Sequence, residues 1–74
     1  MEVHVTLFAT LRGQGPPKRV VDLARDSRVL DLIRALEIPR DKARIIFVNH
    51  RLAGMETPLH AGDRVGIFPH ISGG

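Results

Sequence analysis

The chain has 74 residues and no cysteine, which limits it to one small domain without a large buried active site, disulfides, thiolate nucleophiles or cysteine zinc sites. It has no N-terminal apolar signal segment, and no run of about 18 apolar residues that would cross a bilayer. The net charge of +3 comes from 11 basic residues scattered among 8 acids, without Tyr or Trp to stack on bases, so we expect a cytoplasmic protein that binds neither nucleic acid nor membranes.

The N-terminal part of the chain predicts a β-hairpin. Polar and apolar residues alternate over Glu2–Phe8, as in a strand with one buried face. Glycines and prolines in 13–17 then interrupt regular structure, and Arg19–Leu23 returns as a second strand. The first strand would carry Val3, Val5 and Leu7 on one face and His4, Thr6 and Phe8 on the other.

The spacing of apolar residues becomes helical between Ser27 and Pro39. Four of them fall at i, i+3, i+4 and i+7, which predicts one amphipathic helix. We expect Ser27 to cap its N-terminus, Asp31 to lie in the first turn where the helix dipole favours an anion, and Pro39 to end it. The apolar stripe consists of Val29, Leu32, Ile33 and Leu36.

Three further strands complete the predicted fold. The apolar run Ile45–Val48 and the short strand Arg51–Ala53 are joined by Asn-His, two residue types that tolerate positive φ in a tight turn. Turn-forming residues fill 57–63, and Arg64–Phe68 forms the last strand before Pro69. The order β-β-α-β-β-β predicts an α+β fold, with a mixed sheet of four to five strands and one main helix on one face.

Few side chains offer a catalytic or metal site. The four histidines lie in separate segments without metal-ligand spacing, and neither serine stands in a G-x-S-x-G motif. Gly13-Gln14-Gly15 lacks both the third glycine of a dinucleotide loop and the Gly-Lys-Ser/Thr end of a phosphate loop. We therefore predict no bound cofactor or metal and no catalysis by side chains.

The C-terminal residues 70–74 carry the remaining candidate chemistry. Extended at about 3.3 to 3.6 Å per residue, they would reach roughly 17 Å beyond Pro69, far enough to enter a partner's active site. Gly73 and Gly74 lack Cβ atoms and would fit a narrow channel. The Gly74 carboxylate is ionised at neutral pH and needs activation, for example by ATP. We expect a domain of residues 1–69 and a flexible tail; the alternative is that Gly-Gly is a frayed end.

Three stretches, LFATLR, FVNHRLAG and TPLHAGDRVGIFPHISGG, together with the predicted element order, resemble the ubiquitin-like sulfur carriers of the ThiS/MoaD family, which have a β-grasp fold. The first and last stretches are more similar to the small subunit of molybdopterin synthase than to the thiamin carrier. The resemblance implies a carrier that is not itself an enzyme. Its Gly74 would be adenylated with ATP by an E1-like adenylyltransferase and converted to a thiocarboxylate. The thiocarboxylate would enter the large synthase subunit or another sulfur-accepting enzyme.

The resemblance also implies partner-binding positions. Phe8, Leu52 and Phe68 match outward-facing apolar positions of the molybdopterin small subunit, and strand alternation independently places both phenylalanines on the face away from the helix. Two aromatic side chains there would form an exposed apolar patch, which is typical of an interface. The alternative is that they complete a second small core or cover a loop. The other expected partner contacts are Pro69, His70, Ile71 and Ser72.

The chain departs from the family pattern at three places: His70 replaces a second proline, Asn49-His50 replaces Asn-Gly, and the helix cap moves to Ser27. Other functions therefore stay open. The carrier would serve thiamin synthesis, tRNA thiolation or another sulfur metabolite, or it would be a ubiquitin-like modifier joined to lysines through Gly74. A third possibility is a binding module that uses the apolar patch alone.

Overall fold

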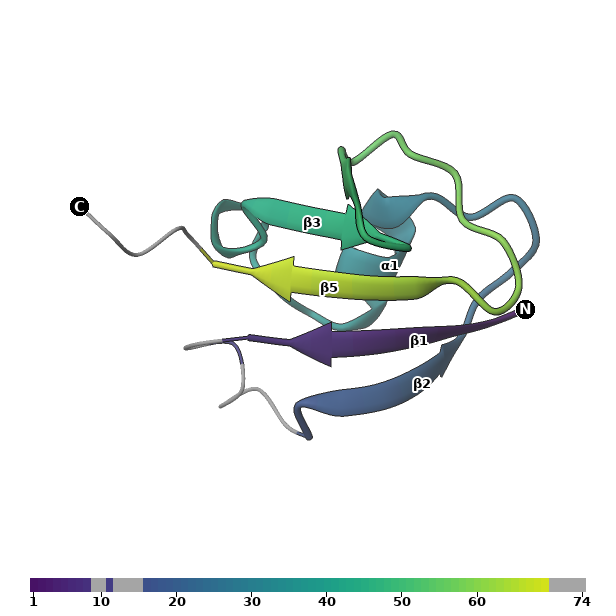
Figure 1. The fold of residues 1–74 in the computed structure, drawn as a ribbon, viewed down its shortest axis with the longest axis horizontal. Helices are drawn as coiled ribbons and strands as arrows, with labels where there is room; N and C mark the ends of the chain where they lie inside the picture. The colour runs from purple at the N-terminus through teal and green to yellow at the C-terminus, as the bar shows by residue number, and fades with distance from the viewer. Residues whose placement is uncertain (9–10, 12–15, 70–74) are drawn as a thin grey trace.

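The computed structural model describes residues 1–8, 11 and 16–69. The strands form one five-stranded sheet in the order β2-β1-β5-β3-β4 (Figure 1). The two central strands, β1 and β5, are parallel, and the other neighbouring pairs are antiparallel. The elements are β1 (Glu2–Leu7), β2 (Lys18–Asp22), α1 (Val29–Ala35), a 3₁₀ helix (Arg40–Lys42), β3 (Ile45–Val48), β4 (Arg51–Ala53) and β5 (Arg64–Phe68).

One helix, α1, crosses one face of this mixed sheet (Figure 1). The α+β class and the β-grasp arrangement predicted from the sequence are confirmed. Among the described residues, no helix has the length and apolar character needed to cross a membrane. The predicted tail, 70–74, lies outside the described residues.

The core lies between the sheet and α1. The apolar residues of β1 and three of the four residues of the helical stripe are almost inaccessible, with Val3, Val29 and Ile33 each 0% exposed, whereas Leu36 is partly buried at the edge of the core. The predicted alternation in β1 is confirmed, because His4, Thr6 and Phe8 lie on the opposite face and are exposed or half-buried. The rest of the core is formed by Val5, Leu7, Leu11, Leu23, Leu32, Ile38, Ala43, Ile46, Leu59, Val65 and Ile67.

The start of α1 differs from the prediction. The N-cap residue is Arg28, in an extended conformation with φ −113° and ψ 173°. The hydroxyl of Ser27 donates to the carbonyl of Ala24 at 2.7 Å, inside the turn before the helix. The carboxylate of Asp31 accepts a hydrogen bond from the Arg28 backbone N–H at 2.8 Å. The predicted Ser27 cap is therefore wrong, whereas the predicted first-turn position of Asp31 is confirmed.

The helix also ends earlier than predicted. Its last residue is Ala35, and Glu37 adopts a left-handed conformation with φ 58°. The N–H groups of Glu37 and Ile38 donate to Arg34 and Ile33 at 3.0 and 3.2 Å, the paired bonds of a Schellman motif. Ile38 then turns into the core, where it is 5% exposed. The motif ends the helix before Pro39 is reached.

The turn between β3 and β4 agrees with the prediction. Asn49 and His50 have φ of 51° and 69°, the two positive values that a type I′ hairpin turn requires. The Asn49 side chain donates to Asp63 Oδ1 and accepts from the Arg64 backbone N–H, both at 3.0 Å. These bonds attach the turn to the start of β5, which accounts for asparagine at this position.

Stability is expected to depend on the helix-facing side of the sheet. Replacing Ile33→Val in the core should lower the free energy of unfolding by about 0.5 to 1.5 kcal/mol, because it removes a buried methyl group. Leu52→Ala, at a side chain that is 74% exposed, should change it by less than about 0.5 kcal/mol. Urea unfolding followed by circular dichroism measures both values, and a larger loss for Leu52→Ala would contradict this assignment of the core.

Candidate functional site

The face of the sheet opposite α1 carries an aromatic cluster that we call the aromatic surface, made of Phe8, Phe47, Phe68 and Leu52. Strand alternation and register bring these side chains to the same face: β3 and β5 align Phe47 with Gly66, and β3 and β4 align Phe47 with Leu52. Phe8 follows β1 directly, and its N–H donates to Ile67 at 3.0 Å, which holds it beside the end of β5.

The ring of Phe68 contacts both other phenylalanine rings. Phe8 and Phe68 stack with ring centroids 4.1 Å apart and planes inclined by 6°. Phe47 meets Phe68 edge-on, at 5.9 Å and 82°. Such ring pairs contribute about 0.5 to 1.5 kcal/mol each beyond the area they bury. Because they hold one another, the rings form a rigid surface that needs little ordering when a partner covers it.

Gly66 provides the floor beneath this cluster. A Cβ at this position would lie 3.3 Å from Phe8 Cε2 and 3.7 Å from Phe68 Cε1. The missing side chain therefore lets both rings lie down on the backbone of β5. Gly66 also pairs with Thr6 on the neighbouring strand β1.

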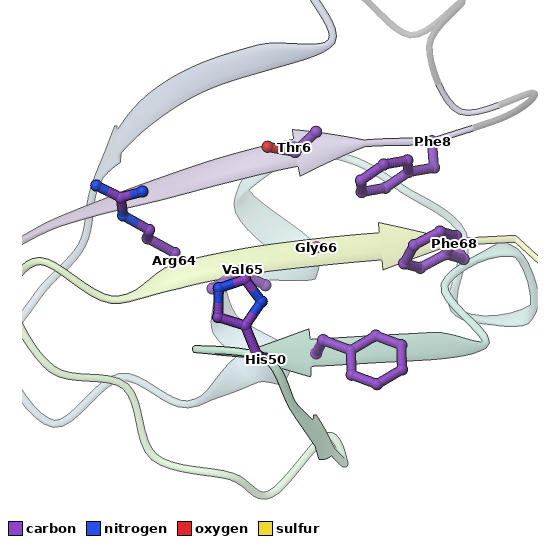
Figure 2. A pocket seen from close by; sticks show the side chains of 8 residues that line it. Thr6, Phe8, His50, Arg64, Val65, Gly66 and Phe68 are labelled. Atoms are coloured by element: carbon purple, nitrogen blue, oxygen red, sulfur yellow. The ribbon is translucent and has the colours of Figure 1, made fainter.

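An open depression of about 470 Å³ runs along this face beside the rings. Its apolar wall is the three phenylalanines, and its polar end is formed by Thr6, His50 and Arg64 (Figure 2). Figure 2 shows the Arg64 side chain extending over β1, away from Phe68. The depression is a place for an apolar side chain or a chain segment of another protein, with cationic and hydroxyl groups at one end.

The predicted partner-binding residues fall into three groups. Phe8 and Leu52 are 36% and 74% exposed on the aromatic surface, and Phe68 is half-buried in the ring stack. Pro69 is buried, so it does not form part of the exposed surface. The remaining predicted residues, His70, Ile71, Ser72, Gly73 and Gly74, lie outside the described residues. The chain passes to them from Pro69, directly after β5 and beside Phe68.

Sequence reasoning missed Phe47 and Gly66 as parts of this site. The run Ile45–Val48 is apolar throughout, and alternation alone does not say which of its side chains leave the core. The useful signal is pairing within the hairpin: a two-residue turn at Asn49-His50 places Phe47 directly opposite exposed Leu52, so both side chains lie on the same face. Gly66 has the same parity as Phe68 in β5 and marks the place where neighbouring side chains need space.

The described residues offer no alternative centre of chemistry. No three His, Asp or Glu side chains among residues 1–8, 11 and 16–69 come close enough to hold a metal ion. All buried side-chain nitrogen and oxygen atoms of these residues have hydrogen-bond partners, so none of these atoms needs a ligand to satisfy it.

A mixed sheet in the order β2-β1-β5-β3-β4 with one covering helix, and an aromatic surface beside the end of its last strand, defines a small ubiquitin-like β-grasp protein. The model of the ThiS family matches residues 5–74, and the chain belongs to this family. It is thus a protein of the sulfur carrier or ubiquitin-like modifier type. No curated protein matches the chain.

Solved structures agree with this family over nearly the whole chain. SAMP1 from Haloferax volcanii superimposes with a TM-score of 0.81 at 27% identity and covers 100% of both chains. A putative molybdopterin converting factor subunit 1 from Pyrococcus furiosus has a TM-score of 0.80 at 28% identity, covering 96% of this chain and 99% of the other. The complex of subunits 1 and 2 of this factor from Helicobacter pylori contains a chain with a TM-score of 0.64 at 27% identity, with 100% of both chains covered.

Filling the floor of the aromatic surface should displace its rings. In Gly66→Val the new side chain would occupy space 3.3 Å from Phe8, so the ring stack should open and the Phe8 and Phe68 ring-proton resonances should move in NMR spectra. Thr6→Val is the matched control, since it places the same side chain on the neighbouring position of the same face, where a Cβ already exists. Equal ring-proton shifts in the two variants would show that Gly66 has no special role.

Proposed function

We propose that this protein is a sulfur carrier that works through the carboxylate of Gly74, most specifically as the small subunit of a molybdopterin synthase. The observation that supports it best is the aromatic surface beside the end of β5, from which the chain continues toward Gly73 and Gly74. A partner that covers Phe8 and Phe68 would receive the tail next to its docking site. The family and the two molybdopterin converting factor neighbours support the choice of pathway.

The chemistry belongs to the main chain at Gly74. A carboxylate oxygen attacks the α-phosphorus of ATP in an E1-like adenylyltransferase, and pyrophosphate leaves to give an acyl-adenylate. Hydrosulfide then attacks the carbonyl carbon, AMP leaves with the C–O bond, and loss of the S–H proton yields the thiocarboxylate. The negative charge of the carboxylate is the reason that activation is needed. The protein is thus a substrate of its partners, and its folded domain serves to present the tail.

The domain contributes by docking. The Helicobacter pylori structure is a complex of subunits 1 and 2 of the molybdopterin-converting factor, so a neighbour of this chain assembles with a second subunit. We extend that assembly to this chain through the aromatic surface. The most exposed apolar side chain on it, Leu52 at 74%, gains most from being covered.

A ubiquitin-like modifier is the second candidate, because SAMP1, the small archaeal modifier protein 1 of Haloferax volcanii, covers this chain completely at 27% identity. A modifier would use the same activated carboxylate, with a lysine amine displacing the leaving group to form an isopeptide. Lysine-linked targets recovered from cells would favour this function, and a stable complex with a molybdopterin synthase large subunit would favour the first.

The tail chemistry is tested by intact mass. Incubation with the E1-like enzyme of the same organism, ATP and a sulfur donor should give the mass gain expected for replacing one oxygen by sulfur, located at Gly74 by peptide fragmentation. A chain extended by one alanine after Gly74 is the control, because it keeps the domain and removes the free glycine carboxylate. Sulfur uptake by the unprocessed extended chain, or none by the original chain, would contradict the proposal.

The docking role is tested at Leu52. Leu52→Asp places a charge on the aromatic surface without touching the core, so the affinity for the adenylyltransferase should fall by about tenfold or more while unfolding in urea is unchanged. Ala61→Asp adds the same charge at another exposed position, in the loop before β5, and should bind normally. Calorimetric titration measures both, and equal affinities for the two variants would show that the surface does not dock the enzyme.

A further inference from the structure

The aromatic surface occupies only one half of the open sheet face, and the other half is basic. The strand register places His4 between Val20 of β2 and Arg64 of β5, and Thr6 beside Lys18. All of these residues stand at the alternate strand positions whose side chains point away from α1. His4, Lys18 and Arg64 are exposed, and Val20 is a large apolar side chain left 54% exposed among them. We call this second half the basic surface.

The basic surface is hollowed rather than flat. A depression of about 390 Å³ lies over β1 and β2, and none of its described lining residues is acidic. Its lining consists of His4, Val5, Thr6, Lys18, Arg19, Val20 and Arg64. Among the described residues, the side chains of Lys18 and Arg64 make no hydrogen bond or ion pair, unlike Arg28, which is paired with Glu56 at 2.6 Å. Their charges therefore stay directed at solvent.

The acidic residues nearest to this depression form bonds with other groups or lie outside its lining. Asp22, at the far end of β2, forms an ion pair with the N-terminal ammonium of Met1 at 3.1 Å. Asp63 is 12% exposed and bound by the Asn49 side chain and by the backbone N–H of His60. Neither lines the basic depression. Glu2, exposed on the same face of β1 and opposite Asp22, also lies outside the depression, so no acidic side chain of the described part of the chain lines it.

The two halves are continuous. Thr6 and Arg64 line both the aromatic and the basic depressions. Figure 2 shows how Arg64 joins them, since its backbone lies in β5 beside Gly66 while its guanidinium reaches over β1. A single protein segment that crosses the sheet from β3 toward β2 would meet phenylalanine rings first and cations afterwards.

We infer that the basic surface binds an acidic segment of the same partner protein that covers the aromatic surface. The inference rests on the proposed function, because it adds a second contact to that docking face. Its physical basis is charge complementarity: carboxylates of the partner would find unpaired Lys18 and Arg64 beside the apolar contact. Attraction between oppositely charged surfaces mainly raises the association rate, and added salt weakens it.

An acidic protein segment fits this surface better than a nucleic acid does. Single-stranded nucleic acids stack their bases on aromatic side chains. Here the Phe8 and Phe68 rings are stacked on each other, and the described lining of the basic depression contains no Phe, Tyr or Trp, only the smaller imidazole ring of His4. The apolar Val20 in its lining suits the aliphatic part of a glutamate side chain better than a sugar-phosphate backbone.

Charge reversal with a matched control tests the inference. Lys18→Glu with Arg64→Glu removes the basic surface, whereas Arg25→Glu with Lys42→Glu changes the net charge equally at exposed positions outside both depressions. In stopped-flow binding to the adenylyltransferase at low salt, the first pair should slow association about tenfold and flatten its salt dependence. The control pair should stay within about twofold of the original chain. Equal slowing by both pairs would overturn the inference.

A second measurement separates this inference from the proposed function. A ¹⁵N-labelled chain is titrated with a synthetic peptide of one leucine followed by several glutamates, and with a single-stranded RNA of equal charge. Peptide-induced shifts at Lys18, Val20 and Arg64, lost in the Lys18→Glu, Arg64→Glu variant, support the inference even if the enzyme never modifies Gly74. Shifts produced by the RNA alone, or peptide shifts spread over the whole chain, overturn it even if thiocarboxylate forms normally.

Discussion

The core and the candidate site both depend on the alternation of side chains along the two central parallel strands, β1 and β5. Each strand sends one residue to the helix and leaves the next on the open face. Phe8 and Phe68 cannot turn inward unless Leu7 and Ile67, at 1% and 0% exposure, turn out. Because a one-residue slip would expose the core, the packing that folds the domain also fixes the aromatic surface.

The small size of the domain places function on its surface. A chain of 74 residues has one layer of core between sheet and helix, and that layer is filled by aliphatic side chains. Under the proposed function, chemistry that needs a closed, water-free site would take place in a partner. A rigid face beside the exit of the chain suits that arrangement, because docking the face raises the effective concentration of the tail at the partner's active site.

The sheet and its covering helix could be predicted from strand alternation, the helical stripe and the Asn-His turn. Strand alternation also predicted two aromatic residues on the open face of the sheet, Phe8 and Phe68. The ends of the helix could not be predicted from the hydrophobic pattern, because local hydrogen bonds determine them. Ser27 bonds back to Ala24, and the Schellman bonds at Glu37 end the helix before Pro39. Phe47 was not predicted as part of the aromatic surface, because an all-apolar run shows no alternation between buried and exposed positions. The burial of Pro69 was not predicted either, because it depends on tertiary packing and not on the position of this residue after the last strand.

The division of the open face into apolar and basic halves bears on how a carrier changes partners. Under the proposed function, an activating enzyme and a sulfur acceptor need the same tail, so each must release the domain before the other binds. Apolar burial mainly slows dissociation, whereas charge attraction mainly speeds association. The open face has three rings and a single highly exposed leucine, so apolar burial slows dissociation only to a limited extent. The cations at Lys18 and Arg64 supply the charge attraction that speeds association. Fast arrival with moderate residence is the combination that lets one small domain serve partners in sequence.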